Sequence, residues 1–347
     1  MFDKKINMLK ALAIMLVVSG HLEFSLIPMF PPYSFQVVLF FFISGMLYND
    51  KYSVVEYILR KLKTLMFPYG FYCVFYLALT ILFSPVIGKF WAMPITFKNE
   101  FVMPFLTGHQ IDVISPMWFV PQLFCSLIVY KFIRKIKLTS QGLLIIFLAA
   151  ALSGVWFAKY DGNYYVLLVS RTLFSLFFIH LGYFYQNKIR DKFNIFSGNI
   201  VAAVLFVQSL LWLANKDYTP SDGIGLSYVL AWGEFDDFLI PILTSLSGIY
   251  ISLLIVEIFY VRLENSVIIN KIGQNTYHIM ANHLFVFNVI TYILLYIKKI
   301  PFDIKTDIYW FYAPLKTTYL YFFLSLAVCT LAGETLKFMN KRLIRGK

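Results

Sequence analysis

Residues 10–21 read KALAIMLVVSGH, a lysine and a histidine separated by ten residues that carry no charge. Uncharged runs of this kind recur along the whole chain of 347 residues. The composition is 60% hydrophobic and only 14% charged, whereas a soluble domain is usually about 25% charged. Because several runs approach the ~20 residues that cross a bilayer as a helix, the sequence predicts a polytopic membrane protein.

Ten apolar segments are predicted as transmembrane helices, since backbone groups in lipid must find their hydrogen-bond partners within the segment. The expected fold class is all-α, a helical bundle of about ten spans that forms a single integral-membrane domain over residues 1–347. The expected spans are 8–27, 33–49, 64–87, 116–133, 141–157, 165–186, 196–214, 238–260, 275–297 and 314–338.

The distribution of charge predicts the orientation of these spans. More than two thirds of the 30 Lys and Arg residues fall in segments that face the cytoplasm if the N-terminus does, as the positive-inside rule requires. The segment 214–237, on the predicted outer side, is acidic, with Lys216 as its one basic residue. We therefore expect a multi-pass protein of the cell membrane with both termini cytoplasmic. The net charge of +12 then records orientation, and no nucleic-acid partner is predicted.

Polar side chains inside spans are costly in lipid, so each is a candidate for function. Lys10 and His21 are eleven residues apart, which is about three helical turns, so they lie on one face about 16 Å apart along the axis. Lys10 is expected at the inner interface and His21 near or beyond the middle of the bilayer. Glu23 points elsewhere. From these residues alone, a packing hydrogen bond explains His21 as well as a catalytic role does.

A basic cluster, RKLK, lies between the second and third expected spans on the predicted cytoplasmic side. It contains Arg60, Lys61 and Lys63. Guanidinium and ammonium groups suit phosphates, so the cluster can be an anion-binding mouth. On composition alone, topology determination together with attraction to anionic lipid is the better explanation.

The motif YHIMANH places three polar residues in the ninth expected span. His278 and Asn282 share a helix face, whereas His283 lies about 140° around the axis from His278. His283 falls near mid-membrane, where it is expected to approach His21. Two histidines at this spacing lack further ligands, so no metal site is predicted.

Two residues of the outer half complete the candidates. Arg171 needs a carboxylate, phosphate or carbonyl partner, and an ion pair with Glu23 or an outer-loop Asp is as good an account as a substrate role. Trp118, in MWFVPQ, is explained most simply as an aromatic anchor at the outer interface.

Soluble-enzyme motifs are absent from the sequence. There is no G-x-S-x-G elbow, P-loop or dinucleotide fingerprint. Ser44 beside Gly45 in FFFISGM is better explained by close helix packing. The cysteines Cys73, Cys125 and Cys329 are odd in number and lie in apolar runs, which predicts small buried side chains without disulfides.

Taken together, the motifs resemble those of the acyltransferase 3 family of integral-membrane O-acyltransferases, in the same order and over most of the chain. The opening residues look most similar to a branch described as fucose 4-O-acetylase-like. The motifs are KALAIMLVVSGH (10–21), FFFISGML (40–47), RKLKTLMFPY (60–69), MWFVPQL (117–123), SRTLFSLFFIHLGYF (170–184) and GQNTYHIMANH (273–283).

The resemblance implies a cytoplasmic acyl-CoA donor, with acetyl-CoA the first expectation, as co-substrate and no bound cofactor. The implied acceptor is a glycan or lipid-linked sugar reached from the membrane or the outer face. His21 would be the catalytic residue, either as a base for the acceptor hydroxyl or as a transient carrier of the acyl group. Lys10, Arg60 and Lys63 would bind the donor phosphates.

Supporting roles follow from the same resemblance. Arg171, Trp118 and His283 would contribute oxyanion stabilisation, sugar stacking and hydrogen bonds, and Glu23 is grouped with them on the acceptor side. The family often has arginine where Lys10 and Lys63 stand, which keeps the charge but weakens bidentate phosphate binding. The extra periplasmic hydrolase-like domain of some members is not found in this sequence.

Two other classes of function fit parts of the sequence. A transporter or flippase for lipid-linked sugars explains many spans and buried polar groups, but not the spacing from Lys10 to His21 together with the inner basic cluster, and no two similar halves are visible. A membrane scaffold or receptor without turnover is a weaker third reading. Membrane lipid is an expected partner in every case, and the choice between monomer and homo-oligomer stays open.

Overall fold

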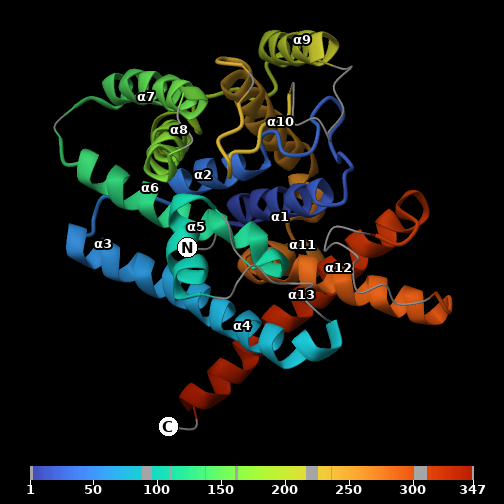
Figure 1. The fold of residues 1–347 in the computed structure, drawn as a ribbon. Helices are drawn as coiled ribbons and strands as arrows, with labels where there is room; N and C mark the ends of the chain where they lie inside the picture. The colour runs from blue at the N-terminus through green and yellow to red at the C-terminus, as the bar shows by residue number, and fades with distance from the viewer. Residues whose placement is uncertain are drawn as a thin grey trace.

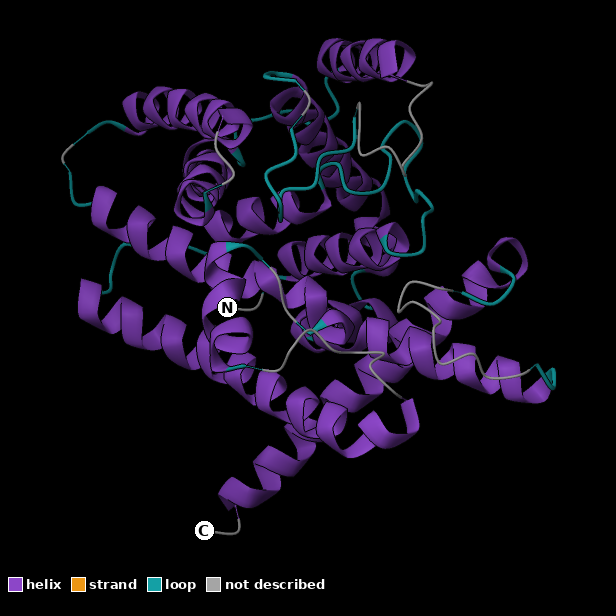
Figure 2. Cartoon of the chain, viewed as in Figure 1, coloured by secondary structure: helices purple, strands orange, loops and turns teal. Residues whose placement is uncertain are grey.

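In the part of the chain that the computed structural model describes, the secondary-structure elements are helices joined by loops and turns (Figures 1 and 2). Its one strand-like pairing is an isolated bridge between Val229 and Glu234. The expected all-α membrane bundle is thereby confirmed. The described residues are 3–87, 96–108, 111–136, 138–160, 163–215, 226–235, 237–300 and 311–345.

Seven helices within the described residues are long and apolar enough to cross a membrane. Each overlaps one of the ten expected spans, although the first begins ten residues before the expected 64–87, so the protein is a multi-pass membrane protein. They are α3 (Val54–Lys61) continued into α4 (Phe67–Ile87), α6 (Phe119–Ile133) with the 3-10 turn before it, α7 (Ser140–Tyr160), α8 (Tyr164–Phe184), α10 (Ile240–Leu263), α12 (Thr276–Ile297) and α13 (Pro314–Arg345).

The other three expected spans are shorter helices: α1 (Lys4–Gly20), α2 (Gln36–Met46) and α9 (Gly198–Asn215). With 17 residues, α1 is about 25 Å long, less than the ~30 Å hydrocarbon core. The expected first span, 8–27, is therefore wrong at its carboxyl end. Hydropathy continues past Gly20, but Glu23 has a φ of 58° and Pro28 has no N–H to donate, so the helix cannot continue.

The FFFISG motif brings α2 directly against α8. A Cβ atom added to Gly45 would overlap the carbonyl of Ile179, at 1.8 Å from its oxygen. Gly182 of α8 is equally close to α2, since a Cβ atom added to it would lie 1.9 Å from the Phe42 carbonyl oxygen. The close helix packing expected at Gly45 is confirmed, and it holds α2 in the middle of the bundle.

Helix α1 lies in the centre of the bundle (Figure 1), with α2 and α10 on one side and α11 (Val267–Gln274), α12 and α13 on the other. Its Ala11, Ala13, Ile14 and Val18 are fully buried. The amino end is capped by the Asp3 carboxylate, which accepts from the Ile6 N–H at 3.0 Å. A central α1 places both ends of the KALAIMLVVSGH stretch among several helices.

The three cysteines are free thiols. Cys73 and Cys329 are buried, and Cys125 is half-buried. The expectation of small buried side chains without disulfides is met.

Candidate functional site

His21 is the C-cap of α1. Its backbone is still helical (φ −72°, ψ −10°), and its N–H donates to the Val17 carbonyl at 3.2 Å. The helical register from Lys10 to His21 is therefore continuous, and the expected common face for the two side chains is confirmed. The carboxyl end of a helix carries partial negative charge, which stabilises a cation such as a transient imidazolium.

His283, on α12, lies against His21, as expected from the sequence. The two ring centroids are 5.1 Å apart, with 45° between the ring planes. His283 is fully buried, and its Nδ1 donates to the Ile279 carbonyl at 2.9 Å. Because a carbonyl only accepts, the Nδ1 of His283 carries the proton and Nε2 the lone pair of the neutral ring. That Nε2 has no hydrogen-bond partner among the described residues.

Tyr33 contacts His21 as well, and the sequence analysis missed it. The Tyr33 hydroxyl is 3.2 Å from His21 Nδ1, and the rings meet edge-on at 84° with centroids 5.6 Å apart. Tyr33 follows two prolines and belongs to none of the motifs. The one sequence signal that points to it is its place at the very start of the second expected span, directly after the short connection from the first.

The Lys10 part of the site combines α1 with the C-terminal helix, α13. Lys10 is half-buried on α1, which packs against α13, the helix that carries Lys337. Lys337 Nζ donates to the Gln274 carbonyl and to Glu334 Oε1, both at 3.1 Å. Lys337 was not among the candidates, because in sequence it is one of several basic residues in the C-terminal segment.

Arg60 and Lys63 lie on one continuous helix, which is not the helix that carries Lys10. Both are exposed on the continuous helix formed by α3, a π-turn and α4, and Arg60 stacks 4.1 Å above the Tyr52 ring. Among the described residues, no contact joins either side chain to Lys10. The same helix does reach α12, because the Tyr277 hydroxyl donates to a backbone carbonyl of the π-turn at 2.9 Å.

A hydrogen-bonded polar face connects α4 with α12. The Tyr72 hydroxyl pairs with His278 Nδ1 at 2.7 Å and accepts from Asn282 Nδ2 at 3.1 Å. The Tyr76 hydroxyl donates to Asn282 Oδ1 at 2.7 Å. The expected common face of His278 and Asn282 is confirmed. The two tyrosines were missed because they sit among many aromatic residues in one apolar run.

Arg171 is fully buried and bonds to backbone carbonyls. Nη1 donates to Ala231 at 2.8 Å, and Nη2 donates to Phe105 and Leu106 at 3.0 and 2.9 Å. The alternative of an ion pair with Glu23 is wrong, since Glu23 is exposed on the segment after α1 and the guanidinium points to these carbonyls instead. Most outer-loop Asp residues lie outside the described residues.

Trp118 is half-buried beside this arginine. The guanidinium carbon of Arg171 is 5.7 Å from the centre of the indole ring, and Phe119 packs edge-on at 6.3 Å. The contact with Arg171 is of cation–π type. The two residues therefore form one unit near the amino-terminal ends of α6 and α8.

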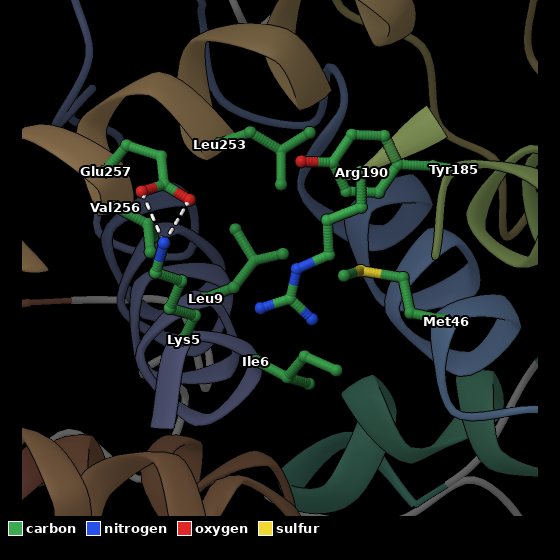
Figure 3. Close-up of a pocket in the computed structure, with 9 residues that line it drawn as sticks. All are labelled: Lys5, Ile6, Leu9, Met46, Tyr185, Arg190, Leu253, Val256 and Glu257. Carbon is green, nitrogen blue, oxygen red and sulfur yellow. Dashed lines mark hydrogen bonds and ion pairs between the residues drawn. The ribbon is translucent and has the colours of Figure 1, made fainter. Parts of the chain in front are cut away.

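A small pocket opens near the amino end of α1 (Figure 3), and it contains none of the predicted site residues. Its charged groups neutralise each other. Lys5 pairs with Glu257 at 2.7 Å, and Arg190 pairs with Asp3 at 2.6 Å. These ion pairs fasten the start of α1 to its neighbours, so the pocket is better explained as a structural joint than as a substrate site.

The comparisons with known proteins agree with the motifs. A family model described as an acyltransferase domain matches residues 3–334. No curated protein and no solved structure matches the chain.

Proposed function

Because the chain belongs to the acyltransferase 3 family of membrane acyltransferases, we propose that it moves an acetyl group from cytoplasmic acetyl-CoA to a hydroxyl of a cell-surface or lipid-linked glycan. The same reaction with a longer acyl-CoA as donor is the variant of this proposal. The observation that carries the proposal is the position of His21, which lies against both Tyr33 and His283 at the end of the helix that carries Lys10.

His21 acts as the base in the proposed reaction. The acceptor oxygen attacks the thioester carbonyl while the imidazole takes the hydroxyl proton. The new C–O bond forms, the C–S bond breaks, and His21 returns the proton to the departing thiolate. A free imidazole titrates near the working pH, and a positioned base contributes about 10²–10⁴-fold to the rate. An acyl-imidazole intermediate on His21 is the alternative route through the same residue.

Lys10 binds donor phosphates at the inner end of α1 in this proposal, together with Lys337. The axial distance from Lys10 to His21 is about 16 Å, close to the length of a phosphopantetheine arm, so a donor held at Lys10 presents its thioester to His21. Arg60 and Lys63, exposed on the neighbouring helix, then contact the nucleotide end of the donor where it leaves the bundle.

The acceptor approaches from the opposite end. Arg171 and Trp118 shape the outer part of the bundle, since their contacts hold the segments around Leu106 and Ala231 together. Glu23, exposed just after His21, is the acidic side chain available to an acceptor hydroxyl. His283 supports the His21 ring from α12. The proposed location is the cell membrane with both termini in the cytoplasm.

The test measures transfer of label from acetyl-CoA to surface glycan in membranes that contain the full chain. His21→Ala and His21→Asn are expected to abolish transfer while the amount of membrane-inserted protein stays unchanged. The matched control is Lys188→Ala, an exposed residue outside the site, which should transfer at the wild-type rate. Transfer that survives in both His21 variants contradicts the catalytic assignment. Intact transfer with lost glycan export points to a transporter instead.

A further inference from the structure

Residues 21–35 connect α1 to α2, and their backbone is unusual. Glu23, Met29 and Tyr33 all have left-handed φ angles, of 58°, 65° and 58°. A bulky aromatic residue rarely adopts this conformation, because its Cβ approaches a backbone carbonyl oxygen. Such strain persists only where the surrounding structure enforces it, and it is concentrated at functional sites.

The strained backbone of Tyr33 is held by a second segment, residues 226–235, which we call the outer strap. The Tyr228 N–H donates to the Tyr33 carbonyl at 2.8 Å, and the Ser227 hydroxyl donates to the carbonyl of Pro32 at 2.8 Å. The backbone carbonyls of Pro32 and Tyr33 are therefore both held by partners about 195 residues away in the chain.

The outer strap is itself anchored inside the bundle. The buried Arg171 donates to the Ala231 carbonyl at 2.8 Å, and the Ser34 hydroxyl and the Gln36 amide tie the turn to the start of α2 through the Pro31 carbonyl, at 2.8 and 3.0 Å. The position of Tyr33 is thus determined by several helices rather than by the local sequence.

The result of these contacts is the approach of the Tyr33 hydroxyl to His21 Nδ1, at 3.2 Å. Within the part of the chain that the structure describes, two titratable groups make ring contacts with His21, namely Tyr33 from the connecting segment and His283 from α12. A neutral imidazole carries a single proton, and the partner of one nitrogen decides which nitrogen keeps it.

We infer that Tyr33 is a positioning residue, whose hydroxyl oxygen accepts the Nδ1–H of His21 and so leaves the Nε2 lone pair for the proton of the acceptor hydroxyl. This inference rests on the proposed function. During transfer the hydroxyl proton moves to Nε2, the imidazolium keeps its Nδ1–H on Tyr33, and Nε2 then gives its proton to the thiolate. The strain at Tyr33 maintains this arrangement.

Tyr33→Phe removes the hydroxyl and keeps the ring. The expected result is a kcat at least about 10-fold lower and an unchanged KM for acetyl-CoA. The acidic limb of the pH profile of kcat is expected to move toward lower pH, because the imidazolium has lost a hydrogen-bond acceptor. The matched control is Tyr296→Phe, since this tyrosine is 84% exposed and should keep the wild-type kcat and profile. A wild-type kcat and pH profile in Tyr33→Phe overturns the inference.

Tyr33→Gly separates positioning from stability, because glycine adopts a positive φ without strain. This variant is expected to lose transfer at least as severely as Tyr33→Phe while its thermal midpoint stays close to that of the wild type. Full transfer in Tyr33→Gly overturns the inference. If the wild type transfers no acyl group from acetyl-CoA, the proposed function fails and the role of Tyr33 fails with it. Wild-type transfer that depends on His21 but not on Tyr33 overturns the inference alone.

Discussion

His180 and His21 both lie among apolar helices, yet their neighbours differ. Tyr130 pairs with His180 Nδ1 and the Ser140 carbonyl with Nε2, each at 2.9 Å, so both nitrogens of His180 have protein partners and the residue holds α6, α7 and α8 together. His21 instead lies at a helix end beside a second histidine and a strained tyrosine. The sequence already singles out His21 among five histidines by its spacing from Lys10, and the tertiary contacts add that His180 holds helices together.

Lys10 is the residue on which donor binding depends in the proposed function. Lys10→Ala is expected to raise the KM for acetyl-CoA about 10-fold or more with little change in kcat, because a lost charge-assisted hydrogen bond to phosphate is worth about 1.5–3 kcal/mol. Lys10→Arg keeps the charge and should stay near the wild type. Steady-state kinetics with labelled acetyl-CoA checks both variants, with Lys188→Ala as control. An unchanged KM in Lys10→Ala contradicts phosphate binding at this position.

At the scale of the element, the contact of α2 with α8 depends on the absence of a side chain. Gly45→Ala places a methyl group where the Ile179 carbonyl oxygen lies, at 1.8 Å, so the helices must separate. Overpacking of this kind costs about 1–3 kcal/mol, and the thermal midpoint in detergent is expected to fall. Gly70→Ala is the matched control, because no atom lies within 4 Å of its added Cβ and alanine is the better helix former by about 1 kcal/mol. Equal midpoints for the two variants would show that the α2–α8 contact does not limit stability.

Hydropathy predicts which segments are helices but not where α1 ends. Leu22, Phe24 and Leu26 continue the apolar run beyond Gly20, which is why the first span appeared to reach residue 27. The segment that follows α1 is also held by partners outside the run. One of them is Gln208, whose amide donates to the Met29 carbonyl at 2.7 Å. A hydropathy window cannot register such a contact.

At the scale of the whole molecule, the candidate site joins parts of the chain that are far apart in sequence. Lys10 and His21 could be predicted together because helical periodicity relates residues within one segment. His283 could be proposed from its depth in the membrane. Tyr33 and Lys337 could not, because one depends on the outer strap and the other on the packing of α13 beside α1.

The orientation of the bundle is the remaining whole-molecule prediction, and it decides which face receives the donor. If both termini are cytoplasmic, the start of α8 faces outward and the segment after it faces inward. Tyr165→Cys, at a site 67% exposed, should then react with a membrane-impermeant maleimide in intact cells, whereas Lys188→Cys should react only after permeabilisation. Native cysteines contribute little background, because Cys73 and Cys329 are buried and Cys125 is half-buried. The reverse labelling pattern would place Lys10 on the outer side, where acetyl-CoA is not available, and would exclude the proposed route of the donor.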